Sequence, residues 1–178
     1  RYEIKKPLVA YFQHSKISRV EEIIARLTKG ENAALVTDAG TPGISDPGGV
    51  LVHHIITVGQ HDIKIVPIPA PCAAITALSI SGLPTDKFVF MGFPPHKKGR
   101  QTFWRNVAAQ EETVVFYESP HRIIKALTEL QGLLGERPVV VCRELTKMFE
   151  SIYRGTINEV LEKVQKAPIK GEYVVIIA

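Results

Sequence analysis

The segment Asp38–Gly48 is the strongest chemical pattern in the sequence. Three glycines and two prolines lie in this segment, and carboxylates stand toward both of its ends. Glycine lets a backbone approach a ligand closely, and proline stiffens the turn. The pattern indicates a loop that holds an adenosine-type ligand, although a tight strand-to-helix turn with Asp46 near the helix start explains the same composition. The spacing matches neither the phosphate-binding P-loop nor the dinucleotide-binding fingerprint, so both are disfavoured.

A second loop, Pro67–Ala74, leads into a helix of small residues. Small side chains would let this backbone lie against a ligand, and close helix-to-sheet packing is the alternative.

Two charged segments, Tyr117–Arg122 and Arg143–Lys147, each follow an apolar strand. The carboxyl ends of strands are where α/β proteins build their sites, so both segments are candidates for binding or catalysis. For Glu118 or Glu144 alone, an ion pair with a nearby arginine is the simpler alternative. His121 alone also reads as a residue at a helix start.

Short apolar runs rich in β-branched residues alternate with amphipathic segments, which predicts an α/β fold. Capping boxes at Ser18/Glu21 and Thr156/Glu159 mark two helix starts. The seam Gly82–Asp86 divides the chain into two α/β lobes, residues 1–82 and 83–178, with a ligand cleft expected between them. The expected strands are Leu8–Phe12, Ala33–Thr37, Lys64–Ile68, Phe88–Met91, Thr113–Tyr117, Val139–Cys142, Glu150–Gly155 and Tyr173–Ile177.

The composition describes a soluble chain with a sizeable core, since 45% of its 178 residues are hydrophobic and 22% are charged. No apolar run approaches the roughly 20 residues of a membrane span, so we expect a cytoplasmic protein with no membrane partner. Cys72 and Cys142 lack the paired spacing of a zinc or redox site and are expected to be buried thiols.

Positive charge is concentrated in one stretch, although the net charge of the whole chain is only +4. Between Lys87 and Gln110 there is no Asp or Glu, and the stretch holds five Lys or Arg and His96. A local excess of this kind attracts polyanions. Its turn-forming centre, Pro94–Arg100, is expected to be exposed.

Four segments, in the same order along the chain, resemble one family. They are Asp38–Gly48, Ser81–Asp86, Phe116–Arg122 and Arg143–Lys147. Over essentially its whole length the chain is similar to the tetrapyrrole-methylase superfamily of S-adenosylmethionine-dependent methyltransferases, and within it to the enzymes that act on 16S ribosomal RNA. The resemblance implies a two-lobed fold with the cofactor in the cleft, a homodimer, and 2′-O-methylation of a cytidine ribose in the small ribosomal subunit.

Residues can be assigned to the reaction that the resemblance implies. A protonated ribose hydroxyl is a poor nucleophile, so a base or a stabiliser of the developing alkoxide is wanted, and no metal is required. The candidates for that role are Lys147, Glu144 and Glu118. The implied S-adenosylmethionine contacts are Asp38, Ala39, Gly40, Ile44, Cys72, Ala73, Tyr117, Glu118 and Leu145. The expected RNA contacts are Lys97, Lys98, Arg100, Arg105, His121 and Arg122.

The sequence departs from the family pattern at two places. The family's apolar first strand, its Pro-Ile-Gly-Asn-type loop and an acidic segment do not precede Arg1, so the N-terminal lobe is expected to lack them. Pro69–Cys72 replaces the more usual Pro-Gly-Pro-Ser. The missing strand keeps open a non-catalytic fragment that binds RNA or dimerises, and the shared fold keeps open a methylase of corrin or porphyrin precursors.

Overall fold

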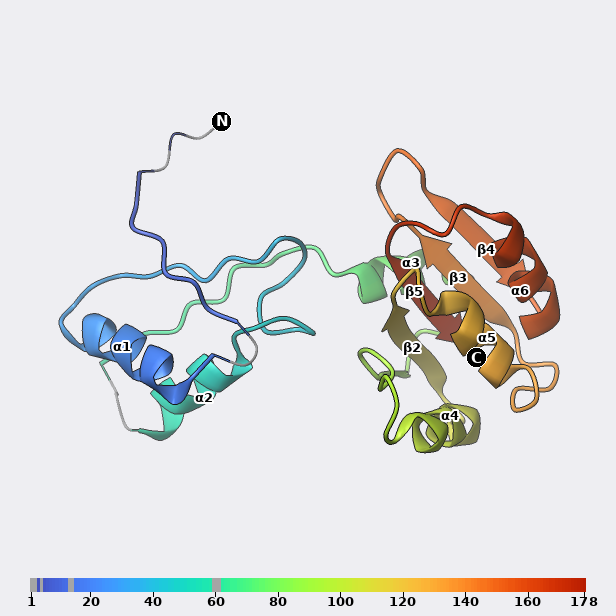
Figure 1. The fold of residues 1–178 in the computed structure, drawn as a ribbon, viewed down its shortest axis with the longest axis horizontal. Coiled ribbons are helices and arrows are strands. Elements are labelled where there is room, and N and C mark those ends of the chain that lie inside the picture. Colours follow the sequence, from blue (N-terminus) through green and yellow to red (C-terminus); the bar gives the residue numbers. More distant parts are fainter. Residues whose placement is uncertain (1–2, 4, 13–14, 59–61) are drawn as a thin grey trace. The chain divides into compact units, whose positions relative to one another are not determined.

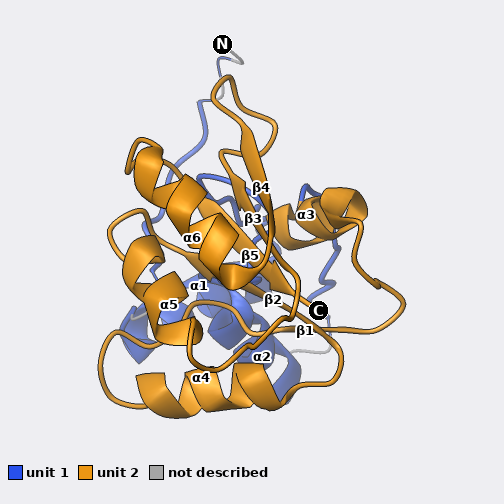
Figure 2. Ribbon diagram, turned by 90° about the vertical axis from the view of Figure 1, so that its right-hand side faces the viewer, with its two compact units in different colours: residues 1–71 blue, residues 72–178 orange. Residues whose placement is uncertain are grey.

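The computed structural model describes Glu3 and residues 5–12, 15–58 and 62–178. The chain divides into two compact units, residues 1–71 and 72–178 (Figure 2). This division falls before the expected lobe boundary at residues 82–83. The reason is that helix α3 (Ala73–Ser81) packs its buried side chains on the sheet of the second unit.

The second unit is built on a five-stranded mixed sheet (Figure 1), whose strand order β1-β2-β5-β3-β4 can be followed in Figure 2. Strands β1 and β2 are parallel, whereas β5 is antiparallel to both β2 and β3, and β4 is antiparallel to β3. Hence β1, β2 and β3 run in the same direction. The strands are β1 (Phe88–Phe90), β2 (Thr113–Glu118), β3 (Val139–Arg143), β4 (Ser151–Gly155) and β5 (Tyr173–Ile177).

Helices cover both faces of this sheet. Three of them pack on one face in the main core: α4 (Arg100–Ala109), α5 (Ile123–Leu130) and α6 (Ile157–Lys166). The opposite face carries α3, whose Ala74, Ala77 and Leu78 pack on alternate residues of the strands. Two faces buried in this way explain why β2, β3 and β5 read as largely continuous apolar runs rather than as alternating ones.

Helix starts follow the sequence prediction in one case and depart from it in another. At α6, Thr156 and Glu159 exchange both bonds of the predicted capping box. At α1 (Ile17–Thr28), the helix begins one residue before Ser18, with Lys16 as its N-cap and no side-chain cap. The Ser18/Glu21 box is therefore wrong, because Ser18 already lies inside the helix.

The first unit packs two helices, α1 and α2 (Gly49–Thr57), around a small apolar core. That core consists of Val20, Ile24, Leu51 and Ile55, with Tyr11, Ile23, Leu27 and Ile63 partly buried against them.

Three strands predicted for the first unit, Leu8–Phe12, Ala33–Thr37 and Lys64–Ile68, are not observed in the described residues. β-branched residues favour a strand only where a hydrogen-bonded partner and a covered face are present. Here side chains remain open to solvent, with Val36 and Ile68 each 75% exposed. The mixed α/β class is confirmed by the second unit. Among the described helices, none combines the length and apolarity needed to cross a bilayer.

Candidate functional site

Three of the predicted loops leave one edge of the sheet in the second unit. Because β1, β2 and β3 run in the same direction, their carboxyl ends share that edge. The segments that follow these strands are residues 91–99, 119–122 and 144–150. The fold thus brings together the aromatic and basic stretch, the Glu118–Arg122 group and the Arg143–Lys147 group, as expected of a site at the ends of strands.

Tyr117 lies at the centre of one cluster on this edge. Its hydroxyl accepts a hydrogen bond from the backbone N–H of Ala74 at 3.1 Å and lies 3.8 Å from the sulfur of Cys72. Its ring makes edge contacts with Phe90 and Phe93, at centroid distances of 5.0 and 5.4 Å. The phenol therefore fixes the start of α3 against the end of β2.

The predicted cofactor residues of this unit gather around that contact. Cys72 and Leu145 pack in the same apolar cluster as Tyr117, and Ala73 opens α3. Cys72, which was expected to be fully buried, is only partly so, because it precedes the helix at its exposed end. Cys142 is buried within β3, and burial raises the pKa of its thiol to about 11.

Glu118 is placed differently, on the opposite face of the sheet from Tyr117. Successive side chains of a strand point to opposite faces. Its side chain is fully buried, and one carboxylate oxygen pairs with Arg122 at 2.7 Å while the other lies 3.7 Å from Arg100. The ion-pair alternative is the one that the structure supports for this residue, and the carboxylate does not lie in the Tyr117 cluster.

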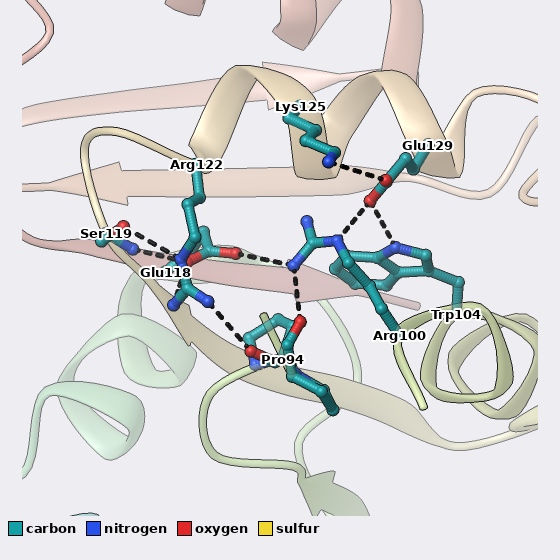
Figure 3. A network of polar contacts seen from close by, with 9 residues as sticks. Pro94, Arg100, Trp104, Glu118, Ser119, Arg122, Lys125 and Glu129 are labelled. Atoms are coloured by element: carbon teal, nitrogen blue, oxygen red, sulfur yellow. Dashed lines mark hydrogen bonds and ion pairs between the residues drawn. The ribbon is translucent and has the colours of Figure 1, made fainter. Parts of the chain in front are cut away.

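A polar network extends from Glu118 through Arg100 to α5 (Figure 3). Arg100 donates to Glu129 at 2.6 Å, and the indole N–H of Trp104 donates to the same carboxylate oxygen at 2.6 Å. Sequence reasoning missed Glu129 and Trp104 as partners of the charged groups. The sequence did contain one signal for Glu129. It stands four positions after Lys125 on the helix that follows Glu118, which is the spacing of an ion pair on a helix.

Arg100 and Arg122, grouped on sequence grounds with the RNA-facing cations, are turned into the protein. Their side chains are only 5% and 18% exposed because buried carboxylates bind them. The remaining expected RNA contacts, Lys97, Lys98, Arg105 and His121, are exposed. We call residues 94–99, which connect the end of β1 to α4, the basic loop.

Lys147 forms an exposed charged cluster at the end of β3. Its ammonium donates to Glu144 at 3.0 Å and to Glu172 at 2.9 Å. Hydrogen bonds to Glu172 and Glu144 raise the pKa of Lys147, and the bond from Lys147 lowers the pKa of Glu144. An ammonium held in this way stays protonated at neutral pH. It suits the role of a fixed cation better than that of a base.

The backbone around this cluster adopts an uncommon conformation. Glu144 and Thr146 have φ angles of 52° and 62°, a left-handed region that side chains other than glycine seldom occupy. The Glu144 carboxylate also accepts the backbone N–H of Glu172 at 3.0 Å. Residues in such conformations persist where the surroundings hold them, and they gather at functional sites.

In the first unit, the Asp38–Gly48 loop is tied to the second predicted loop. The Thr41 hydroxyl donates to the carbonyl of Pro71 at 3.2 Å, and Gly40, with φ 73°, would carry a β-carbon 3.6 Å from the same carbonyl oxygen. Asp38, Ala39 and Ile44 are exposed. Beside the loop lies a cavity of about 300 Å³ lined by Tyr11, Gly43, Ser45, Asp46, Gly48, Gly49 and Val50.

The chain is similar to several ribosomal RNA small subunit methyltransferases I. It is 44% identical to that of Synechocystis sp. over 99% of this chain and 63% of the relative. It is 43% identical to that of Escherichia coli O157:H7, with 99% and 62% covered, and 41% identical to that of Bacillus subtilis, with 99% and 60% covered. The chain thus spans about three fifths of the length of these relatives.

Solved structures share its fold. The methyltransferase CobJ superposes with a TM-score of 0.67 at 18% identity, over 93% of this chain and 72% of that one. Uroporphyrin-III C-methyltransferase from Thermus thermophilus, solved with S-adenosyl homocysteine, gives a TM-score of 0.56 at 15% identity, over 90% and 72%. The family model of the tetrapyrrole (corrin/porphyrin) methylases matches residues 4–161. By this match over most of its length, the chain belongs to the tetrapyrrole (corrin/porphyrin) methylase family.

Proposed function

We propose that this chain is part of an S-adenosylmethionine-dependent enzyme that methylates the 2′-hydroxyl of a cytidine in 16S ribosomal RNA. The observation that carries the proposal is the identity of 41–44% to the ribosomal RNA small subunit methyltransferases I over nearly the whole chain. The exposed lysines of the basic loop support an RNA acceptor. As in the expectation from sequence, the enzyme would act in the cytoplasm as a homodimer.

The residues present fit S-adenosylmethionine, judged by the loops that would hold it. In the segment Asp38–Gly48, Gly40 is exposed and has a φ angle of 73°, and because it has no side chain a ligand can approach its backbone closely. The carboxylates of Asp38 and Asp46 can accept hydrogen bonds from hydroxyl or amino groups.

In the second unit, Cys72, Ala73, Tyr117 and Leu145 offer an apolar surface beside the start of α3. When bound, S-adenosylmethionine supplies an electrophilic methyl group on a sulfonium sulfur. The exposed start of the helix and the phenol of Tyr117 would orient that group and exclude water.

The role proposed for Lys147 is electrostatic. In the transfer, the ribose oxygen would form its bond to the methyl carbon as the bond from that carbon to the sulfonium sulfur breaks, and the hydroxyl proton would pass to solvent. The negative charge that develops on the oxygen would be stabilised by a fixed ammonium nearby. Holding the reactants in line supplies a further part of the acceleration, up to about 7–11 kcal/mol in favourable cases. Glu144 and Glu172 would act by fixing the ammonium of Lys147.

The proposed RNA surface consists of the exposed side chains of Lys97, Lys98, Arg105 and His121. Single-stranded RNA binding weakens with salt at a slope of about −0.7 per phosphate neutralised. The Lys97→Ala, Lys98→Ala double variant should therefore flatten the slope by about 1.4 while leaving S-adenosylmethionine binding unchanged. Arg100 is left out of this variant because it is buried.

The direct test is transfer of a tritiated methyl group from S-adenosylmethionine to small ribosomal subunits that lack the modification. The same assay is run with this chain and with this chain completed by the remaining segments of the Synechocystis sp. relative. Label in an alkali-resistant dinucleotide identifies ribose methylation. Label on a uroporphyrin-type acceptor instead would favour a tetrapyrrole methylase. Absence of S-adenosylmethionine binding by calorimetry in both chains would favour a non-catalytic RNA-binding fragment.

A further inference from the structure

The buried carboxylate of Glu118 is held between two guanidinium groups (Figure 3). One oxygen pairs with Arg122 at 2.7 Å and also accepts the backbone N–H of Ser119 at 2.7 Å. The other oxygen lies 3.7 Å from Arg100. Glu118 therefore contacts both arginine side chains, more closely that of Arg122, while Arg100 is also bound by Glu129 at 2.6 Å.

Both arginines also hold the backbone of the basic loop. Arg122 donates to the carbonyl of Pro94 at 3.1 Å, and Arg100 donates to the carbonyl of Pro95 at 3.1 Å. These carbonyls belong to consecutive prolines, whose φ angles are already restricted by their rings. The two arginines that contact Glu118 therefore also hold the start of the basic loop.

The other end of the basic loop is fixed by the same network. Arg100 is the first residue of α4 and binds Glu129 at 2.6 Å, and Trp104 binds that same carboxylate one turn later. Between the two anchors lie only residues 96–99, which include the exposed side chains of His96, Lys97 and Lys98. So short a segment, fixed at both ends, can present its cations in few directions.

The network is poorly suited to a purely stabilising role. Among the described residues, no hydrogen-bond partner is found for one oxygen of Glu118 or for one nitrogen of Arg100, although both atoms are buried. Buried ion pairs often stabilise a fold less than packed apolar side chains of similar volume. The feature that an apolar core could not supply here is the pair of bonds to the Pro94 and Pro95 carbonyls.

We propose that Glu118 is a positioning residue that sets the direction of the RNA-binding cations of the basic loop through Arg100 and Arg122. This inference rests on the proposed function for its RNA substrate. A loop ordered before binding loses less conformational entropy when RNA binds. Glu118 thus acts on the affinity for RNA, through two other residues, rather than on the transferred methyl group.

The test is a double-mutant cycle on RNA binding. Glu118→Gln keeps the shape of the side chain but removes its charge. We expect it to weaken binding of a single-stranded 16S ribosomal RNA oligonucleotide about tenfold and to flatten the salt slope as the Lys97→Ala, Lys98→Ala variant does. In the background of that double variant, Glu118→Gln should weaken binding little further. The proposal is overturned if Glu118→Gln lowers the RNA affinity equally in the parent and in the double variant, or if it does not lower the RNA affinity of the parent.

A matched control separates positioning from general destabilisation. Trp104→Phe perturbs the same network at Glu129 but leaves both proline carbonyls bound, so it should retain the RNA affinity and the salt slope of the parent. If Glu118→Gln fails to fold, Arg122→Lys replaces it. That substitution keeps the charge and loses the forked geometry that reaches both Glu118 and Pro94.

A measurement without RNA keeps this inference distinct from the proposed function. Trypsin cleaves after Lys97 and Lys98, and an anchored loop should resist it. Glu118→Gln should speed cleavage there about tenfold or more, with cleavage after the exposed Lys29 of the other unit unchanged. If the lysine double variant binds RNA like the parent, the RNA function is contradicted, and the tryptic rates still decide whether Glu118 anchors the loop. Unchanged rates at Lys97 and Lys98 overturn the anchoring.

Discussion

Tyr117 and Glu118 are neighbours in β2, yet their side chains lie on opposite faces of the sheet and belong to different groups. The phenol of Tyr117 accepts the N–H of Ala74 at the start of α3. The carboxylate of Glu118 is buried with Arg100 and Arg122 beneath the basic loop. One strand end thus serves two purposes, and substitutions at the two positions should affect different ligands.

Replacing Tyr117 by Phe should weaken S-adenosylmethionine binding. The change removes the acceptor for the Ala74 N–H, and a typical hydrogen bond contributes about 0.5–1.5 kcal/mol to stability. We expect a loss of about 1 kcal/mol in the free energy of unfolding and a lower affinity by calorimetry. Tyr153→Phe, on the main-core face of the sheet, is the control and should bind S-adenosylmethionine like the parent. Equal affinities for Tyr117→Phe and the parent would exclude this cluster from the cofactor site.

Replacing Gly40 by Ala should affect binding more than the same change at Gly30. Both glycines have positive φ angles, 73° and 86°, so an alanine at either position is strained by about 1–2 kcal/mol. Gly30 follows α1, and a β-carbon added there would meet no atom of the described residues within 4 Å, whereas Gly40 lies in the proposed cofactor loop. Urea unfolding should report similar losses in the free energy of unfolding for the two variants. Calorimetry should report weaker S-adenosylmethionine binding for Gly40→Ala alone. Similar binding by both variants would remove the loop from the site.

Lys147 should act as a cation, so Lys147→Arg should retain much of the activity that Lys147→Ala loses. Truncation of a group that stabilises developing charge lowers kcat by about 100-fold or more in comparable sites. Single-turnover methyl transfer, with S-adenosylmethionine affinity measured in parallel, checks this expectation. An inactive arginine variant beside an intact affinity for both ligands would indicate a base instead.

The pH dependence of the Lys147 cluster follows from its two pKa shifts. The pKa of Lys147 is raised from 10.5, so its pairing is complete below that value and is lost as pH rises through the folded pKa. The pKa of Glu144 is lowered from 4.5, so its pairing is complete above that value and is lost as pH falls through the folded pKa. The cluster should stay intact between these limits. NMR titration of the Lys147 side chain should accordingly show no ionisation between about pH 6 and 9.

The two thiols should differ in reactivity toward iodoacetamide. Cys142 is buried, and its pKa is raised to about 11, so very little thiolate is present near neutral pH. Cys72 is partly exposed at the start of α3. Mass spectrometry of the native protein should find Cys72 modified first and Cys142 modified only after unfolding. Rapid native modification of Cys142 would contradict the burial of β3.

The strands of the second unit could be predicted from the sequence to within one residue at each end. The central strands β2, β3 and β5 were readable because helices cover both faces of the sheet there and each is a largely continuous apolar run. The same composition at Ala33–Thr37 predicted a strand that is not observed, since composition does not encode whether a partner strand is present. For Arg100, the sequence indicated an exposed cation. Its actual partner, Glu129, lies on a helix that follows 29 positions later, and such long-range pairings cannot be found from local pattern.

The central place of β5 in the sheet has a consequence for the order in which the protein can fold during synthesis. This strand pairs with both β2 and β3, yet it leaves the ribosome after β1, β2, β3 and β4. Until then, β1 with β2 and β3 with β4 form two separate pieces, each with an unpaired strand edge that can join another chain. A pause in translation before residues 173–177 have emerged from the ribosome should therefore make the nascent chain a chaperone client. Faster emergence of these residues should raise the yield of folded protein.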